Sequence, residues 1–499
     1  MKQLLLICTV FPFAAAAQLQ LAKIFSDNMM LQREKPVVIW GKAAPGNTVN
    51  ASFANTKGTT VAQKDSVWKI ILPQQKAQTI PQTLTVQSGR QSILLSNILV
   101  GDIWLCMGQS NMEFPMQREM HYTEAIKTSN QPLIRLYNPA YAGKNIFNST
   151  YSDSVVQLLN KNDFYKGQWK SCDSNSFKTM SAVAYYFGKN ISAQTGIPVG
   201  LINIAIGGAP LESFIDPDAL LQDTRFNNKV KGDWLLNDAL PEWIRERGKQ
   251  NILEAQNIPS DRYGKSHAYK PGFAYRMGII PLLNIPIKGI ICYQGESNAQ
   301  EIERVNEYGA LWALMIKDYR KKWRQPALPF YYVQLSSIDT LKYKGALWPQ
   351  FRDEQRKMLT LIPNSGMAVC SDIGFKDDVH PTNKKDVGLR LSYWALNNTY
   401  GKAVIPSGPL PQKATYKNRL LTVSFMYAAK GLLTSDGKAL KGFSENGNVP
   451  LVATIKNDKV LIQMAGKPEF IYYGWKSFSD GNLTNSDSLP ASTFKIKVE

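Results

Sequence analysis

The sequence of 499 residues has little of what builds a metal site or a disulfide framework. It has three histidines, and none lies at ligand spacing from another, so a zinc site is not indicated. Its five cysteines are far apart and form no CxxC pair. Cys106, Cys292 and Cys370 each sit in a strand-like apolar run, where a free thiol behaves as a small hydrophobic side chain. Disulfides are therefore not indicated.

Runs of like charge are also missing. No run of five or more Lys or Arg occurs, and no basic helix with interleaved aromatic residues. The 58 Lys and Arg against 39 Asp and Glu nevertheless leave a net charge of +19. Because this charge is spread along the chain, we expect no nucleic-acid partner. A spread positive field remains compatible with a mild attraction for acidic sugars.

After residue 17 no apolar run reaches the roughly 18 residues that a membrane span needs, so no span is expected. Residues 1–17 instead combine a basic start at Lys2, a short apolar run and small residues ending at Ala17. This pattern is typical of a cleaved secretory signal peptide. Ile7 before Cys8 argues against a lipoprotein. We therefore expect an exported protein, periplasmic or secreted.

The length predicts about three domains. Short alternating strands over residues 18–97 predict an N-terminal β domain. Apolar strands that alternate with helical periodicity over 98–405 predict an α/β domain with a parallel sheet, and an irregular polar insertion covers about 217–270. Beyond residue 406 the β pattern returns and predicts a C-terminal β domain.

Within the α/β region the apolar runs are those of strands covered on both faces, and the segments between them repeat apolar residues at helical spacing. The expected strands are 102–107, 199–206, 289–293, 330–335 and 367–371. The expected helices are 180–195, 306–323, 350–361 and 384–398.

Four loops that follow these strands carry the residues suited to chemistry, because the site of an open parallel sheet lies at the carboxyl ends of its strands. Residues 108–113 place a serine after a glycine at a strand-to-helix turn. Residues 207–210 contain two glycines whose N–H groups can approach a ligand closely. Residues 294–298 combine amides, a carboxylate and a hydroxyl, and residues 377–381 combine two aspartates with a histidine.

The three histidines limit a serine mechanism to three candidate bases. His380 has an aspartate, Asp377, three residues before it, and this spacing can set a carboxylate against one ring nitrogen while the other faces Ser110. His121 lies in an expected surface loop, and His267 lies in the irregular insertion. We expect both to shape substrate access or to have no role.

In order and spacing, the four loops resemble the sialate O-acetylesterase family of SGNH hydrolases. The resemblance spans the α/β region, and the flanking β segments look like that family's accessory domains. It implies a flavodoxin-like SGNH-hydrolase core with a parallel sheet, flanked by N- and C-terminal β domains. It also implies a serine esterase that removes O-acetyl groups from sugars, sialic acid being the name-giving substrate.

Carried over by position, the resemblance makes Ser110 the nucleophile, His380 the general base and Asp377 the residue that orients it. Asp378 is the rival to Asp377, although the three-residue spacing favours Asp377. Ser110 would attack the acetyl carbonyl and form an acetyl-enzyme, which water activated by the same histidine releases as acetate. This chemistry requires no metal and no organic cofactor.

The oxyanion hole is expected to use the N–H groups of Ser110 and of Gly207 or Gly208, with Gly208 preferred. General SGNH hydrolases add an asparagine from a Gly-x-Asn-Asp segment, which this sequence replaces. Gln294 and Asn298 are therefore the rival amide donors.

The remaining polar residues of these loops, and nearby arginines, are candidates to bind an O-acetylated sugar or glycan. An acetylxylan or other polysaccharide O-acetylesterase would use the same triad, and a glycan-binding protein with a degenerate core is the alternative outside enzymes. The oligomeric state stays open. The expected substrate-binding residues are Gln109, Asn111 and Glu296, and the arginines that could hold a sugar carboxylate are Arg118, Arg135 and Arg276.

Overall fold

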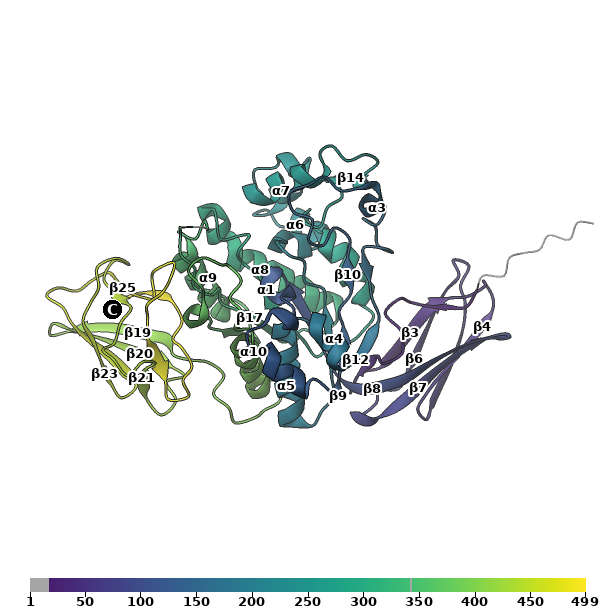
Figure 1. Cartoon of the computed structure of the whole chain (residues 1–499), viewed down its shortest axis with the longest axis horizontal. Helices are drawn as coiled ribbons and strands as arrows, with labels where there is room; N and C mark the ends of the chain where they lie inside the picture. Colours follow the sequence, from purple (N-terminus) through teal and green to yellow (C-terminus); the bar gives the residue numbers. More distant parts are fainter. Residues whose placement is uncertain (1–17, 342) are drawn as a thin grey trace, which may run out of the picture.

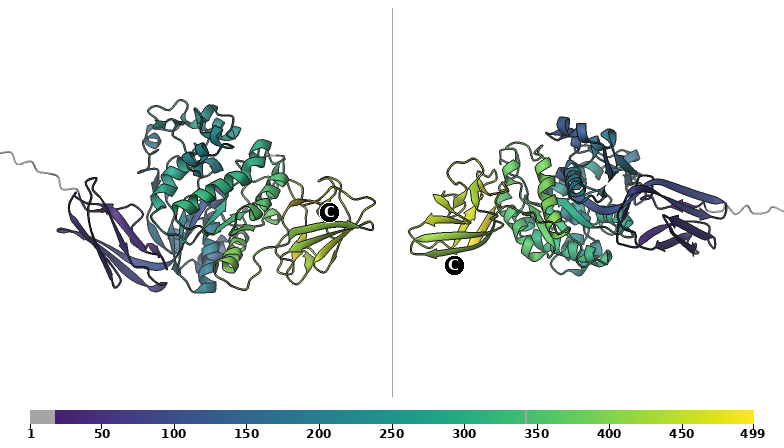
Figure 2. Two further views of the ribbon diagram at one scale, coloured as in Figure 1. Left: turned by 180° about the vertical axis from the view of Figure 1, so that it is seen from behind. Right: turned by 90° about the horizontal axis from the view of Figure 1, so that it is seen from below.

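The computed structural model describes residues 18–341 and 343–499, so the expected signal peptide lies outside the described residues. Three parts follow one another along the longest axis (Figure 1). A β unit formed by the first described residues lies at one end, an α/β unit lies in the middle, and a second β unit lies at the other end. The two further views show the same order (Figure 2).

The middle unit is built on a parallel sheet in which the five expected strands lie side by side in the order β13-β8-β16-β17-β18. Numbered along the chain, this is the order 2-1-3-4-5. The expected strands are confirmed, although three of them end two or three residues earlier than the sequence predicted. Their bounds are β8 (Gln91–Gly108), β13 (Val199–Asn203), β16 (Gly289–Tyr293), β17 (Phe330–Val333) and β18 (Ser365–Ala368).

Two further strands that the sequence did not reveal extend this sheet beyond β13. The strand β9 (Gln131–Tyr137) pairs parallel with β13, and β12 (Trp169–Cys172) pairs antiparallel with β9. Pro132 and Arg135 interrupt the apolar run of β9, which hides the usual signal of a buried strand.

Helices cover both faces of the sheet. The Phe330 ring packs on Trp312 of α8, with 4.6 Å between ring centroids, whereas Tyr331 hydrogen-bonds Thr399, directly after α10. Neighbouring strand residues point to opposite faces, so α8 and α10 lie on opposite sides. No helix of the described residues is long and apolar enough to cross a bilayer. The expected helices are confirmed as α5 (Ala182–Thr195), α8 (Ile302–Lys322), α9 (Trp348–Leu361) and α10 (Lys385–Asn398).

The strand β8 is shared between the N-terminal β unit and the parallel sheet. Its first half pairs antiparallel with β7 (Gln78–Ser88), and its second half pairs parallel with β13 and β16. Between these halves it pairs with β2 (Met30–Gln32). The boundary expected at residue 98 thus falls inside one continuous strand, and a single cluster of buried side chains extends from Leu19 to Leu410.

The C-terminal β unit has a hydrophobic core of its own, separate from that cluster. Its largest sheet has the order β19-β20-β24-β23, and a second sheet has the order β22-β25-β27. The strands of these two sheets are β19 (Leu410–Lys417), β20 (Leu420–Met426), β22 (Phe443–Ser444), β23 (Ala453–Lys456), β24 (Lys459–Gln463), β25 (Phe470–Tyr473) and β27 (Phe494–Lys497).

The four cysteines of the described residues are free and buried, as the sequence predicted. They are Cys106, Cys172, Cys292 and Cys370. Burial raises the pKa of the Cys370 thiol to about 12, so this side chain stays protonated and packs as a small apolar group.

A buried arginine on α9 attaches the C-terminal unit to the middle unit. Arg352 is fully buried and donates to the carbonyl oxygens of Ser477 at 3.2 Å, Gly474 at 3.1 Å and Lys476. It also donates to the Ser337 hydroxyl at 3.3 Å. Because its acceptors are neutral, burial lowers the pKa of Arg352 to about 9. This side chain therefore orders residues 474–477 against α9.

We predict that Arg352→Met loosens the C-terminal unit, because the substitution leaves several buried carbonyls without a donor. The expected loss is about 3 kcal/mol of unfolding free energy, together with faster proteolysis of the connection at residues 402–409. Thermal unfolding and limited trypsin digestion measure both. Lys357→Met, at a half-exposed position on the same helix, is the matched control. Equal melting and cleavage of the two variants would contradict the role given to Arg352.

Candidate active site

A cavity of about 760 Å³ opens where the parallel strands end. Ser110 and the glycines of the β13 loop line it together with His380, which follows β18 in the chain. Three of the four loops predicted from the sequence, residues 108–113, 207–210 and 377–381, thus line one cavity. The fourth, residues 294–298, lies behind the cavity wall.

The nucleophile candidate and the base candidate are in contact. Ser110 is the first residue of the short helix α1 (Ser110–Glu113), and one residue, Gln109, separates it from the end of β8. Its Oγ lies 2.8 Å from Nε2 of His380. In the tautomer whose Nδ1–H donates to a carboxylate, this ring nitrogen accepts the serine proton. The pair has the geometry that activates a serine hydroxyl.

The carboxylate that contacts the histidine is Asp378, not Asp377. Nδ1 of His380 lies 3.1 Å from Asp378 Oδ1, and the backbone N–H of His380 donates to the same oxygen at 2.8 Å. The three-residue spacing that favoured Asp377 brings side chains together on a helix, but residues 377–380 form bends and no helix. The turn closed by the Asp378 side chain places its carboxylate beside the ring. Asp378 therefore replaces Asp377 as the candidate orienting residue.

The surroundings keep His380 neutral near pH 7. Burial lowers the pKa of its imidazole below the ordinary 6.5, and the cations Lys384 and Arg118 lower it further, whereas the Asp378 carboxylate opposes the shift. A neutral imidazole is the form that accepts a proton from serine.

The double-glycine turn presents one N–H group to the cavity. The N–H of Gly207 donates to the Tyr141 hydroxyl at 3.1 Å, whereas the N–H of Gly208 has no acceptor among the described residues. Gly208 has φ of +76°, and a Cβ on it would lie 2.3 Å from the Tyr269 hydroxyl. The position therefore requires glycine, and the free N–H group supports Gly208 over Gly207 as the oxyanion donor.

Neither amide expected to complete the oxyanion hole faces the cavity. Nε2 of Gln294 donates to Asn298 Oδ1 at 2.8 Å, and Nδ2 of Asn298 donates to Glu212 at 2.9 Å. The N–H of Leu211 also donates to Asn298 Oδ1 at 3.1 Å. Both amides are buried. The structure thus contradicts the prediction that Gln294 or Asn298 meets the reacting carbonyl, because their hydrogen bonds are made inside the protein.

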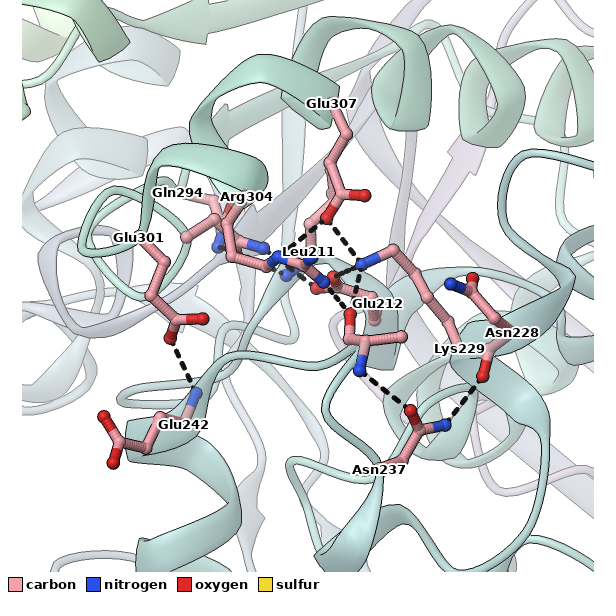
Figure 3. A network of polar contacts seen from close by, with 12 residues as sticks. Leu211, Glu212, Asn228, Lys229, Asn237, Glu242, Gln294, Glu301, Arg304 and Glu307 are labelled. Carbon is pink, nitrogen blue, oxygen red and sulfur yellow. Dashed lines mark hydrogen bonds and ion pairs between the residues drawn. The ribbon is translucent and has the colours of Figure 1, made fainter.

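A buried network of charged side chains, centred on Lys229 and Glu212, lies next to Gln294 (Figure 3). Nζ of Lys229 donates to Glu212 at 2.9 Å, to Glu307 at 2.6 Å and to the Ala239 carbonyl at 2.8 Å. Burial alone would raise the pKa of Glu212, but Lys229 and the hydrogen bond from Asn298 bring it below its ordinary value. The network joins the inserted segment to α8 and leaves the two amides no freedom to turn toward the cavity.

Two of the three expected substrate-binding residues are buried instead of lining the cavity. Nδ2 of Asn111 donates to Glu296 at 2.5 Å and to the carbonyl of Val379 at 2.9 Å, while Nζ of Lys384 donates to Asn111 Oδ1 at 2.5 Å. Since Val379 precedes His380, these contacts tie the histidine loop to the serine helix. Of the three, Gln109 alone lines the cavity.

Lys384 was not predicted as a residue of the site. A single lysine at the start of an amphipathic helix is expected to be exposed to solvent, yet Lys384 is fully buried. Burial lowers the pKa of its ammonium to about 7, and burial raises the pKa of Glu296. The Asn111 amide, which donates to one and accepts from the other, separates the two groups.

The remaining cavity wall comes from two segments that the sequence did not connect to the site. Trp243 and Arg247 come from α7 (Glu242–Ile252) in the insertion. Lys144 and Phe147 come from the loop between β10 (Ala140–Tyr141) and α3 (Asp153–Val156). The Arg247 guanidinium lies 5.8 Å from the Phe147 ring centroid and 5.9 Å from that of Trp243. The insertion is therefore part of the cavity.

Of the three candidate arginines, only Arg118 lines the cavity. Arg135 is buried and donates to the Pro132 carbonyl at 2.7 Å, so it supports β9. Arg276 pairs with Asp261 at 2.5 Å, away from the cavity. The prediction that Arg135 or Arg276 binds a sugar carboxylate is therefore wrong for this site.

The other two histidines do not line the cavity. His121 contacts Glu119 at 2.9 Å. His267 is fully buried, burial lowers its pKa to about 3, and its Nδ1 accepts from the Tyr269 N–H at 3.1 Å. His267 therefore acts as a neutral packing residue that supports Tyr269.

Comparison with known proteins shows that this chain is similar to carbohydrate esterases. Residues 276–395 match a family model described as carbohydrate esterase, sialic acid-specific acetylesterase. The sialate O-acetylesterase of Homo sapiens is 27% identical over 436 residues, which cover 80% of this chain and 75% of that protein. That of Pongo abelii is 27% identical over 434 residues, with the same coverage of both chains.

A solved structure is similar over nearly the whole chain. The crystal structure of a carbohydrate acetylesterase from Xanthomonas citri matches with a TM-score of 0.78 and 29% sequence identity. The match covers 96% of this chain and 99% of that one. The likeness therefore includes both β units as well as the parallel sheet.

We predict that the Lys384 cation, together with burial, holds the acidic limb of the pH profile at low pH. Activity needs neutral His380 and is lost as the pH falls through its pKa, so the wild-type limb should lie below pH 6.5. Lys384→Met removes a charge that lowers this pKa, so the limb should move to higher pH. Because the histidine loop also loses a tether, kcat should fall by about 10- to 100-fold.

Profiles of kcat/KM with p-nitrophenyl acetate measure the shift, and Lys385→Met at the next, partly exposed position is the control. An acidic limb that stays in place in Lys384→Met would contradict the electrostatic role.

Proposed function

We propose that this chain, a carboxylic-ester hydrolase of the sialate O-acetylesterase type, removes O-acetyl groups from sialic acid with Ser110 as its nucleophile. The observation that carries the proposal is the 2.8 Å contact between Ser110 Oγ and His380 Nε2 at the wall of a cavity. A carboxylate on the other ring nitrogen completes the arrangement.

In the first half of the reaction, Ser110 Oγ attacks the acetyl carbonyl carbon while its proton moves to His380 Nε2. The tetrahedral intermediate collapses when the bond to the sugar oxygen breaks, and His380 returns the proton to that oxygen. The sugar leaves and the acetyl group stays on Ser110. In the second half, His380 takes a proton from water as the water oxygen attacks the acetyl carbon. The bond between this carbon and Ser110 Oγ then breaks, His380 returns the proton to Oγ, and acetate leaves. Asp378 stabilises the imidazolium in both halves.

The negative charge on the acetyl oxygen needs donors that are already in place. The N–H groups of Ser110 and Gly208 are the proposed backbone donors, since the Gly208 N–H has no acceptor within residues 18–341 and 343–499. The loss of one such donor typically costs about 10² to 10³ in rate.

The parallel sheet supports an SGNH core of the flavodoxin-like kind. When β9 and β12 at its edge are left aside, the five central strands have the order 2-1-3-4-5. The serine follows the first of them, β8, next to the position where the order of the strands reverses. The histidine loop follows the last strand, which gives the chain order serine, aspartate, histidine for the proposed triad.

Positive charge in the cavity favours an acidic sugar over a neutral one. Arg118, Lys144 and Arg247 line the cavity, against the single acidic side chain of Glu113, which pairs with Lys144 at 2.7 Å. Arg118 packs over the Phe114 ring at 4.9 Å and is the proposed contact for the carboxylate. Sialic acid carries such a carboxylate, whereas the xylan backbone does not.

We predict that acetate release from O-acetylated sialic acid exceeds release from acetylated xylan, and that Ser110→Ala abolishes both. Release from sialic acid is expected to be faster because the cationic cavity attracts its carboxylate. Both activities are expected to vanish in the variant because it lacks the nucleophile. Side-by-side acetate assays of the wild type and the variant measure both. Preference for xylan would transfer the protein to polysaccharide deacetylation, and equal rates in wild type and variant would favour a glycan-binding role.

We also predict that the two adjacent aspartates have unequal roles. Asp378→Asn should lower kcat by at least about 10²-fold, because the imidazole loses the carboxylate that fixes its tautomer and stabilises its charged form. Asp377→Asn should cost less than tenfold. Steady-state kinetics of the two variants are a matched pair, since both change one carboxylate to an amide. A larger loss in Asp377→Asn would return the orienting role to Asp377.

A further inference from the structure

We propose that the side-chain amide of Gln109 is the third donor of the oxyanion hole, beside the N–H groups of Ser110 and Gly208. The inference rests on the proposed function, since it assigns a catalytic contact within the same site. It fills the place left by Gln294 and Asn298, whose amide groups donate to Asn298 Oδ1 and to Glu212.

The orientation of the Gln109 amide is fixed by what surrounds its oxygen. Oε1 accepts from the N–H of Gly295 and the N–H of Ser297, each at 3.4 Å, and from Nε2 of Gln294 at 3.3 Å. Backbone N–H groups can only donate, so they select the oxygen end of the amide. The NH₂ end of Gln109 must then point away from these donors.

The NH₂ end has an unused capacity to donate. Gln109 is 3% exposed and lines the cavity beside Ser110 and Gly208. No described residue accepts a hydrogen bond from its Nε2. Nε2 of Gln109 is not among the buried polar atoms that lack a partner, so its N–H groups are open to the cavity, where the oxygen of a bound acetyl group can accept a hydrogen bond from them.

The surrounding contacts keep the amide beside the proposed backbone donors. Ser297 Oγ donates to the Gly208 carbonyl at 2.9 Å, which joins the 294–298 loop to the double-glycine turn. Gln109 contacts that loop through its side chain and precedes Ser110 in the chain. Its amide is therefore held between the two loops without the need to rearrange during the reaction, as electrostatic stabilisation requires.

In the reaction the amide transfers no proton. When Ser110 Oγ bonds to the carbonyl carbon, the π electron pair moves to the acetyl oxygen, and Nε2–H of Gln109 donates a hydrogen bond to this oxyanion. When the intermediate collapses, the pair returns to form the carbonyl again and the sugar oxygen leaves with the proton held by His380. Gln109 contributes only a stronger hydrogen bond to the intermediate than to the ester.

The test is Gln109→Glu in the full chain, because glutamate keeps an oxygen for the three internal donors and removes the NH₂ group. We expect kcat with p-nitrophenyl acetate to fall by about 10² to 10³-fold, with KM changed less than threefold and the melting temperature little changed. Phenylboronic acid, whose adduct with Ser110 carries an anionic oxygen, should bind about 10²-fold more weakly.

A residue that only supports the loops would give the opposite result, since Gln109→Glu preserves the acceptor. A folded Gln109→Glu with kcat and boronate affinity within threefold of wild type overturns the proposal. If this variant does not fold, the kcat and the boronate affinity of the neutral Gln109→Met are compared with those of the wild type by the same threefold limit. Gln117→Glu adds the same charge to the cavity, so the loss in Gln109→Glu must exceed the loss in Gln117→Glu.

Ser110→Ala, assayed in parallel, separates the two levels of inference. Loss of activity in Ser110→Ala with full activity in Gln109→Glu refutes only the role of Gln109. Full activity in Ser110→Ala refutes the proposed function itself, and the role of Gln109 with it.

Discussion

The parallel pairing of β8 with β13 on one side and β16 on the other is the constraint on which the site depends. Asn203 lies opposite Cys106, and Tyr293 lies opposite Gly108, so the three strands end at one edge of the sheet. The serine helix, the double-glycine turn and the 294–298 loop leave from that edge. A shift of this register by one residue would separate groups that must lie within hydrogen-bond distance.

Much of the fold was readable from sequence because the strands that form its centre are buried on both faces. Continuous apolar runs such as 289–293 therefore predicted their own positions, and the glycine at 208 predicted a turn that no other residue fits. Ser110 and His380 were predicted because the serine follows a glycine at the end of a strand and the chain has three histidines, and the structure brings the two side chains into contact. The strand β9 was missed, since Pro132 and Arg135 break its pattern and Arg135 finds backbone acceptors when buried.

The sequence failed where the role of a side chain depends on a partner distant in the chain. Gln294 and Asn298 carry the chemistry of oxyanion donors, but Glu212 and Lys229 engage them from the insertion. Asp377 and Asp378 differ by one position, and only the bend of the backbone decides which carboxylate meets the ring. The spacing of two residues in the sequence says only how near they are along the chain. A hydrogen bond also requires that the donor and acceptor atoms point toward each other in the folded structure.

The shared strand β8 has a consequence for how such a protein can change over evolution. Its 18 residues belong to both the N-terminal β unit and the parallel sheet, so neither can be cut out without breaking a ladder in the other. The connection around residues 402–409 lies between the two cores instead, so an exchange of the C-terminal unit there breaks no strand ladder. Such an exchange still has to supply acceptors for the buried Arg352, whereas the N-terminal unit and the parallel sheet are inherited as one piece.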